Sequence, residues 1–342
     1  MKKRTPWKLI PLKSVPIFIL LLLSLGGTQA FSFSPTVVLG GRLDQVFSPQ
    51  SAALWGDMYG FGSWRTTLGS EAYAVFNADS SFSLPLDQQA ASVDQHSLSA
   101  QVGLSLPRGS LLLSSETFFS IKDPLYGLTM LPDWRGRYGI ALDQKSTKKA
   151  YVGYSGSYLY QEKGTEDRLS QSTAIGFIYE PSFTRSYRFE LNGSLDDLRQ
   201  RETSSGQQRR DYGTAGEFEV SGLAGYFMDW SLQILAGARL SNDPTYEASI
   251  ADLEAQISWG PTRNLNLSAL LYGEGLSYWE RTTEDGSDEL TRIDIGGQVE
   301  LDWTFNNSLY YTVRLTGAHI LSNEPSLASW DISLGLGIEW GF

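Results

Sequence analysis

The chain ends in Trp330-Asp331-Ile332-Ser333-Leu334-Gly335-Leu336-Gly337-Ile338-Glu339-Trp340-Gly341-Phe342. Every second residue of this stretch is large and apolar, and the residues between them are Asp, Ser, Gly or Glu. A period of two is that of an extended strand whose two faces meet different environments. The stretch therefore predicts a long β-strand with one apolar and one polar face.

The same alternation recurs along most of the chain, in segments too long for an ordinary soluble sheet but suited to tilted membrane strands. The sequence therefore predicts an all-β fold, a transmembrane antiparallel up-and-down β-barrel of about 14 strands, with roughly 12–16 allowed. The expected strands are 65–77, 97–106, 110–122, 135–145, 149–160, 170–180, 185–197, 211–222, 228–241, 247–259, 264–278, 290–304, 308–321 and 329–342.

The connections between these segments alternate between short and longer ones, which is typical of outer-membrane barrels. An even number of strands places both chain ends on the short-turn side, which is periplasmic in such barrels. Short connections are expected at 107–109, 146–148, 181–184, around 225, 260–263 and 306–307, and longer ones at 123–134, 161–169, 198–210, 242–246, 279–289 and 323–328.

The last strand carries a family resemblance. Leu334, Leu336, Ile338, Trp340 and Phe342 fill every slot of a pattern that resembles the C-terminal assembly signal of bacterial outer-membrane β-barrel proteins. The resemblance implies a cell outer membrane location in a Gram-negative-type envelope, with lipid, periplasmic chaperones and the barrel-assembly machinery as partners. It also implies that the last strand closes the barrel against the first, but it implies no substrate.

The N-terminus divides into two parts. Residues 1–30 combine a basic start, a short apolar run and the small residues Thr28 and Ala30, which is typical of a cleaved secretory signal peptide. Residues 31–64 alternate weakly and are interpreted as a periplasmic extension, a plug or extra strands, with the barrel at 65–342. The segment and strand number are similar to those of the long-chain fatty-acid transporters, although their Asn-Pro-Ala hatch motif is absent.

Composition excludes several classes of protein. The 342 residues contain no cysteine, so disulfides, Cys-ligated zinc and a thiol nucleophile are excluded. Two histidines leave little for a His-rich metal site, and we expect no cofactor or metal. A net charge of −11 argues against nucleic acid as a partner, because nucleic-acid binders normally present a basic face.

If the apolar faces meet lipid, the polar faces line the lumen, and acidic side chains far outnumber basic ones there. Such a surplus favours a hydrated interior and attracts cations. The residues expected to line the pore are Arg188, Glu190, Glu217, Glu219, Arg239, Asp252, Glu254, Arg292, Asp294, Glu300, Asp302 and Arg314.

The sequence thus predicts a passive diffusion pore for small hydrophilic solutes with a weak cation preference. A barrel for hydrophobic solutes, similar to the fatty-acid transporters, and a non-conducting surface or structural barrel remain as alternatives. Homo-oligomer formation is left open, because sequence does not reveal it.

Catalysis is not expected. Neither His96 nor His319 has the His-x-Ser spacing of outer-membrane phospholipases and lipid A deacylases. Asp94-Gln95-His96 has the Asp-x-His spacing of outer-membrane proteases but no Asp-x-Asp partner. The acidic stretch 284–289 does not match a calcium-binding EF-hand loop and is interpreted as a solvated hairpin loop.

Overall fold

The computed structural model describes residues 33–47, 52–67, 71–85, 93–123, 127–163, 167–202, 206–225, 227–284, 286, 288–306 and 309–341. The expected signal peptide, residues 1–30, and the terminal Phe342 lie outside the described residues. No helix in these ranges is long and apolar enough to cross a membrane.

The described residues form sixteen β-strands and two short 3-10 helices. The strands are β1 (Phe33–Phe47), β2 (Ala52–Thr67), β3 (Ala72–Pro85), β4 (Val93–Leu106), β5 (Gly109–Asp123), β6 (Gly127–Ala141), β7 (Lys148–Gln161), β8 (Arg168–Ser182), β9 (Arg185–Glu202), β10 (Gln208–Leu223), β11 (Met228–Ser241), β12 (Ala248–Thr262), β13 (Leu265–Thr282), β14 (Glu289–Asn306), β15 (Leu309–Ser322) and β16 (Ser329–Gly341), and the helices are η1 (Pro244–Tyr246) and η2 (Pro325–Leu327).

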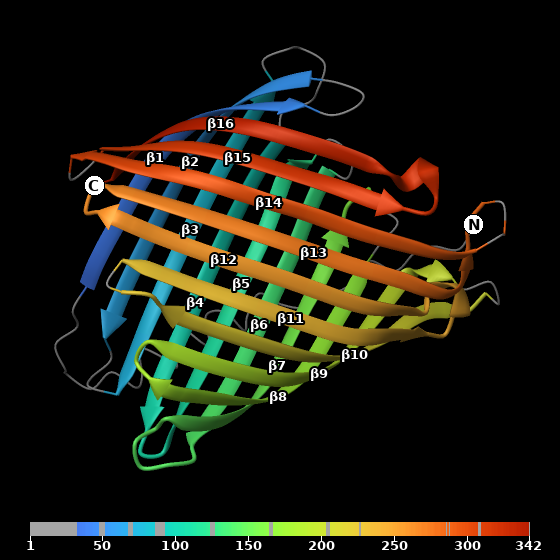
Figure 1. Ribbon diagram of the computed structural model, residues 1–342, viewed down its shortest axis with the longest axis horizontal. Coiled ribbons are helices and arrows are strands. Elements are labelled where there is room, and N and C mark those ends of the chain that lie inside the picture. Colours follow the sequence, from blue (N-terminus) through green and yellow to red (C-terminus); the bar gives the residue numbers. More distant parts are fainter. Residues whose placement is uncertain are drawn as a thin grey trace, which may run out of the picture.

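Each strand pairs antiparallel with its sequence neighbours, and β1 pairs with β16 to close the barrel. Figure 1 shows this closed wall, with the red β16 beside the blue β1. Closure removes every free strand edge, so all backbone donors and acceptors of the wall can be satisfied within the sheet. The predicted up-and-down barrel is confirmed, with a strand number at the upper end of the expected range.

The two strands beyond the expected fourteen come from the N-terminal part of the chain. Residues 33–64 form β1 and most of β2, so this segment lies in the barrel wall and the barrel begins before residue 65. The expected strand 65–77 is wrong as a single element, because the connection between β2 and β3 falls inside it. Gly69 and Ser70 are turn-forming residue types, but an alternation count passes over so short a break.

The long connection expected at 123–134 is also mostly strand, since β6 begins at Gly127. Pro132 explains the error, because proline lacks the N–H that a central strand normally donates. The structure tolerates it where pairing with β7 is interrupted between Met130 and Asp133, while Pro132 still pairs with Thr117 of β5.

Two connections at the long-loop end share one design. Ser241-Asn242-Asp243-Pro244 and Ser322-Asn323-Glu324-Pro325 each lead into a 3-10 helix. Asn242 Oδ1 accepts from the backbone N–H of Arg210 at 2.8 Å, and Asn323 Oδ1 accepts from that of Thr291 at 2.9 Å. Each Asn thus replaces a ladder bond at the strand end, which keeps these loops short and packed at the rim.

Candidate functional site

The two faces of the barrel wall differ in chemistry. Residues opposite each other in an antiparallel pair share a face, and the register places all twelve predicted pore residues on the polar one. The other face carries large apolar side chains that are freely exposed, such as Ile175 at 67% and Leu271 at 65%.

Contacts that skip a strand show that the polar face is the inner one. Tyr151 of β7 donates its hydroxyl to Glu190 of β9, passing over β8. Tyr59 of β2 likewise donates to Glu339 Oε1 of β16 at 2.6 Å, passing over β1. Side chains of next-but-one strands converge only on the concave side of a closed sheet, so these residues line the lumen.

Tyrosine rings lie over glycines on this inner face. A Cβ on Gly176 would come within 2.1 Å of the Tyr151 ring, and one on Gly296 within 2.2 Å of the Tyr272 ring. The sequence analysis did not single out these tyrosines. A Tyr at a polar-face position facing a Gly on the next strand is the signal that could have found them.

Three arginines among the predicted residues are paired with carboxylates. Arg188 Nη2 contacts Glu217 and lies 2.8 Å from Glu219 Oε2. Arg292 binds both carboxylate oxygens of Asp294, at 2.8 and 2.6 Å, and Arg314 pairs with Glu300. The pairs of Arg188 and Arg314 bridge neighbouring strands, whereas the bidentate Arg292–Asp294 pair lies along β14.

Three neighbouring carboxylates have no such partner. Asp252 faces Glu274 on the next strand, and Glu254 lies two residues along β12 on the same face. No hydrogen bond or ion pair joins any of the three to another residue in the described part of the chain. We call Asp252, Glu254 and Glu274 the carboxylate patch. Arg292, which binds Asp294, attracts Glu274 through its charge without forming an ion pair, so the patch keeps a net negative charge that faces the lumen.

The remaining predicted residues are placed as follows. Asp302 accepts from the Thr312 hydroxyl at 2.9 Å, and Arg239 Nε donates to the backbone carbonyl of Tyr246 at 2.9 Å. The structure therefore distributes the twelve residues along the inner wall of β9–β15 and does not gather them into one compact site.

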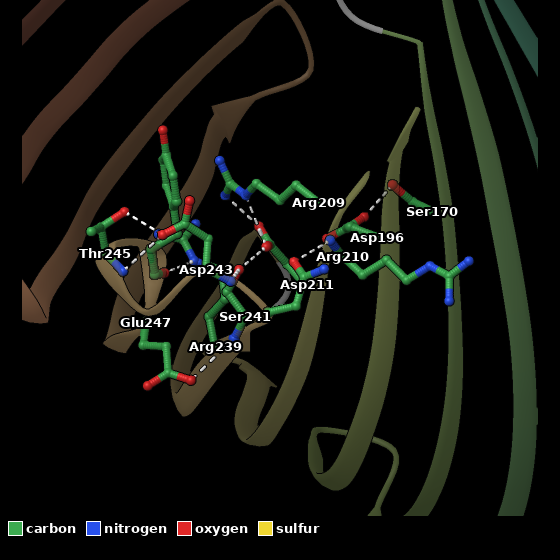
Figure 2. Close-up of polar contacts among 12 residues, drawn as sticks. Ser170, Asp196, Arg209, Arg210, Asp211, Arg239, Ser241, Asp243, Thr245 and Glu247 are labelled. Atoms are coloured by element: carbon green, nitrogen blue, oxygen red, sulfur yellow. Dashed lines mark hydrogen bonds and ion pairs between the residues drawn. The ribbon is translucent and has the colours of Figure 1, made fainter. Parts of the chain in front are cut away.

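At the long-loop end, the inner wall carries a tight network of polar side chains (Figure 2). Arg209 pairs with Asp211, both with side chains only 6% exposed, and its guanidinium lies 3.3 Å from the centroid of the Tyr246 ring. Ser241 donates to Asp211 at 2.7 Å, and the Thr245 hydroxyl donates to Asp243 at 2.8 Å. The network fixes η1 against the mouth of the barrel.

Cavities hollow the inner wall near the short-turn end. One of about 980 Å³ is lined by Arg108, Arg137, Lys149 and Tyr151, and another of about 640 Å³ by Glu180, Arg185 and Asp229 among others. Within the described ranges, no group of three or more His, Cys, Asp or Glu side chains is arranged to hold a metal ion.

The residues of the predicted assembly signal lie on the outer face. Leu334, Leu336, Ile338 and Trp340 are exposed there, and Leu336 and Trp340 face Leu43 and Leu39 of β1. The last strand therefore closes the barrel against the first, as the resemblance implied. Phe342 lies outside the described residues.

An apolar outer wall around a charged inner wall defines a β-barrel of the bacterial outer-membrane type. No family model and no curated protein matches the sequence. Solved structures do match. In-vitro folded OmpT, an outer membrane protein of Vibrio cholerae in a trimer form, has a TM-score of 0.52 at 8% identity, covering 92% of this chain and 100% of that one.

A loop L8 deletion mutant of the same OmpT gives a TM-score of 0.51 at 8% identity, over 92% of this chain and 100% of that chain. The outer membrane protein opdK from Pseudomonas aeruginosa gives 0.48 at 9% identity, over 90% and 98%. At such identities the similarity to OmpT shows a shared fold and nothing about solutes.

Proposed function

We propose that this protein is an outer-membrane pore through which small hydrophilic solutes diffuse, with a preference for cations. The charged inner wall of a sixteen-stranded barrel is the observation that carries the proposal. Barrels of 16–18 strands are wide enough to leave an aqueous channel, whereas eight-stranded ones are filled by side chains. Outside the strands, the described residues form only connections at the two ends, including η1 and η2.

The carboxylate patch supports the cation preference. Lumen carboxylates that are paired with arginine contribute little net field, but Asp252, Glu254 and Glu274 form no ion pair within the described chain. Rings and clusters of Asp and Glu raise the local concentration of cations and lower that of anions.

The remaining parts of the proposal concern the cell. We propose export by the signal peptide of residues 1–30, handling by periplasmic chaperones, and insertion by the barrel-assembly machinery through the last strand. Both chain ends then lie in the periplasm, and the loops that contain η1 and η2 lie on the extracellular side. Permeation needs no catalysis, and homo-oligomer formation is compatible with the apolar outer wall.

Hydrophobic-solute transport is less well supported, because the segment that would form a hatch contributes β1 and β2 to the wall. A structural barrel would differ from a pore in having no conductance. Conductance therefore separates the proposal from both alternatives.

The test is conductance of the refolded protein in planar bilayers under a KCl gradient. We expect steady openings with cation preference, and a roughly two- to threefold fall in the cation-to-anion permeability ratio for the triple variant Asp252→Asn, Glu254→Gln, Glu274→Gln. The matched control Glu300→Gln with Arg314→Gln removes one charge of each sign, so the ratio should hold. A correctly folded barrel without conductance would overturn the proposal.

A further inference from the structure

Three polar side chains form a hydrogen-bonded chain on the outer face of β3 and β4. Ser80 Oγ lies 2.8 Å from His96 Nδ1, and His96 Nε2 lies 3.0 Å from Asp94 Oδ2. Sequence spacing did not reveal this arrangement, because Ser80 and His96 are brought together as a cross-strand pair by the β3–β4 hairpin.

Asp94 is held firmly in this chain. Its side chain is only 8% exposed, and it also accepts from the backbone N–H of Ile121 at 2.9 Å and from the Ser120 hydroxyl at 3.2 Å. A buried carboxylate with these donors stays in place and orients the imidazole. His96 is further fixed by the Phe119 ring, 5.0 Å away between centroids.

The hydrogen bonds select one protonation pattern. With Nε2–H donating to Asp94, Nδ1 of His96 carries the lone pair and accepts from the Ser80 hydroxyl. A hydroxyl, an imidazole that can take its proton, and a carboxylate that orients the imidazole are the three parts of an activated serine nucleophile. The two ring nitrogens have swapped partners relative to the serine-protease arrangement, but either nitrogen can act as the base.

Ser80 is exposed, and its bond to His96 is the one side-chain hydrogen bond that it makes with the described residues. The hydroxyl is thus available to a molecule approaching the outer wall. By contrast, Ser97 on the neighbouring inner face donates to Asp79 at 2.9 Å and is buried.

The position of the chain suggests its substrate. About ten residues of β4 separate His96 from the short-turn end, which at ~3.3 Å per residue and a tilt near 45° is a height of ~23 Å. That height is close to the ~25 Å apolar band of an outer-membrane barrel, which places the three residues near its long-loop edge. Exposed Leu98 and Met58 flank them on the outer face.

We propose that Ser80, His96 and Asp94 form a hydrolytic site for carboxylic esters of amphipathic molecules, with the acyl chain lying along the apolar wall. Ser80 Oγ bonds to the ester carbonyl carbon as His96 Nδ1 takes its proton. The C–O bond to the alcohol then breaks, and the alcohol leaves with that proton. Water, deprotonated by His96, hydrolyses the acyl-serine to a carboxylic acid and restores the Ser80 hydroxyl.

The experiment uses the refolded full chain in detergent micelles with a fluorophosphonate probe and with p-nitrophenyl esters of two to sixteen acyl carbons. We expect covalent labelling at Ser80, found by peptide mass spectrometry, and faster hydrolysis of the longer esters. Ser80→Ala should lose the label, and His96→Ala and Asp94→Asn should slow hydrolysis by roughly 10²–10⁴-fold.

Ser97→Ala is the matched control and should keep both activities, while bilayer conductance should be unchanged in Ser80→Ala. The inference is overturned if wild-type protein, shown to be folded by circular dichroism, carries no label on Ser80, or if Ser80→Ala hydrolyses the esters at the wild-type rate. Because labelling of the wild type decides the matter, a variant that fails to fold does not remove the test.

Discussion

The inner surface of the barrel has two unlike walls. On β4–β9, charges are largely matched: Arg135 lies 3.1 Å from Asp133, and Lys149 lies 2.7 Å from Glu180. On β10–β16, carboxylates outnumber the arginines, and the carboxylate patch forms no ion pair in the described chain. The negative charge of the lumen is therefore concentrated on one side and does not form a ring.

The walls also differ in how their aromatic side chains are held. Tyr151 on the balanced wall donates to Glu190 and lies under the Arg137 guanidinium, 3.5 Å from the ring centroid. Tyr272 on the acidic wall covers Gly296 in the same way but has neither contact. The balanced wall therefore holds its tyrosine in a network, whereas the acidic wall combines ion pairs with the carboxylate patch, whose side chains can meet a permeating ion.

The largest loss of stability on mutation is expected where the two walls meet. Arg188 of β9 joins them, because it contacts both Glu217 and Glu219 of β10. Arg188→Ala leaves two carboxylates unpaired, one of them only 10% exposed, and should lower the free energy of unfolding by about 2–3 kcal/mol. Urea unfolding in lipid vesicles measures this loss.

Arg314→Ala is the matched comparison, since among the described residues Arg314 forms its ion pair with Glu300 alone. We expect a loss of about 1 kcal/mol from this single, partly exposed pair. Equal losses in the two variants would contradict the view that Arg188 joins the walls.

A smaller difference in stability should distinguish the sites of Tyr151 and Tyr272. Gly176→Ala places a methyl group into the Tyr151 ring, which is held by Glu190 and Arg137, and should cost about 1–2 kcal/mol. Gly296→Ala meets the Tyr272 ring at a similar distance, but that ring is free to move into the lumen, so the cost should stay below about 1 kcal/mol. Thermal unfolding of both variants measures the two costs. A larger loss of stability in Gly296→Ala than in Gly176→Ala would contradict the difference proposed between the walls.

Much of this architecture could be predicted from the sequence, because the period-two pattern reports which face of a strand meets lipid. Leu334, Leu336 and Ile338 could be placed on the outer face, and Glu254 and Asp294 on the inner one, without coordinates. The same pattern restricts the register of neighbouring strands, because a slip of one residue would turn the charged side chains of a strand toward the lipid.

What the sequence could not provide depends on pairing across strands. Alternation places both Arg292 and Glu274 on the inner face. It does not reveal that Arg292 forms an ion pair and that Glu274 forms none in the described chain. Ser80 and His96 are distant in the chain and meet only through the hairpin register. Weak alternation also concealed β1 and β2, whose glycines blur the contrast between faces.

The smallest change in stability is expected at the short-turn rim, where the two walls use different turn residues. On the acidic wall, the β10–β11 connection uses Gly225 at φ 72°, a conformation that glycine adopts freely. On the balanced wall, the β6–β7 connection has Ser146 at φ 54°, and Asp143 holds it by accepting from the Thr147 hydroxyl and from the Lys148 N–H at 3.2 Å.

The Thr147 hydrogen bond lowers the pKa of Asp143 below its ordinary value, since it stabilises the ionised carboxylate. A lowered pKa in the folded state means that the stabilisation is present at neutral pH and is lost as pH falls through the folded value. Asp143→Ala should therefore be slightly less stable than wild type at pH 7 and equal to it in strong acid. Thr147→Val should remove most of this pH dependence, and a stability difference that is constant across a pH series of unfolding curves would show that Asp143 acts through turn geometry alone.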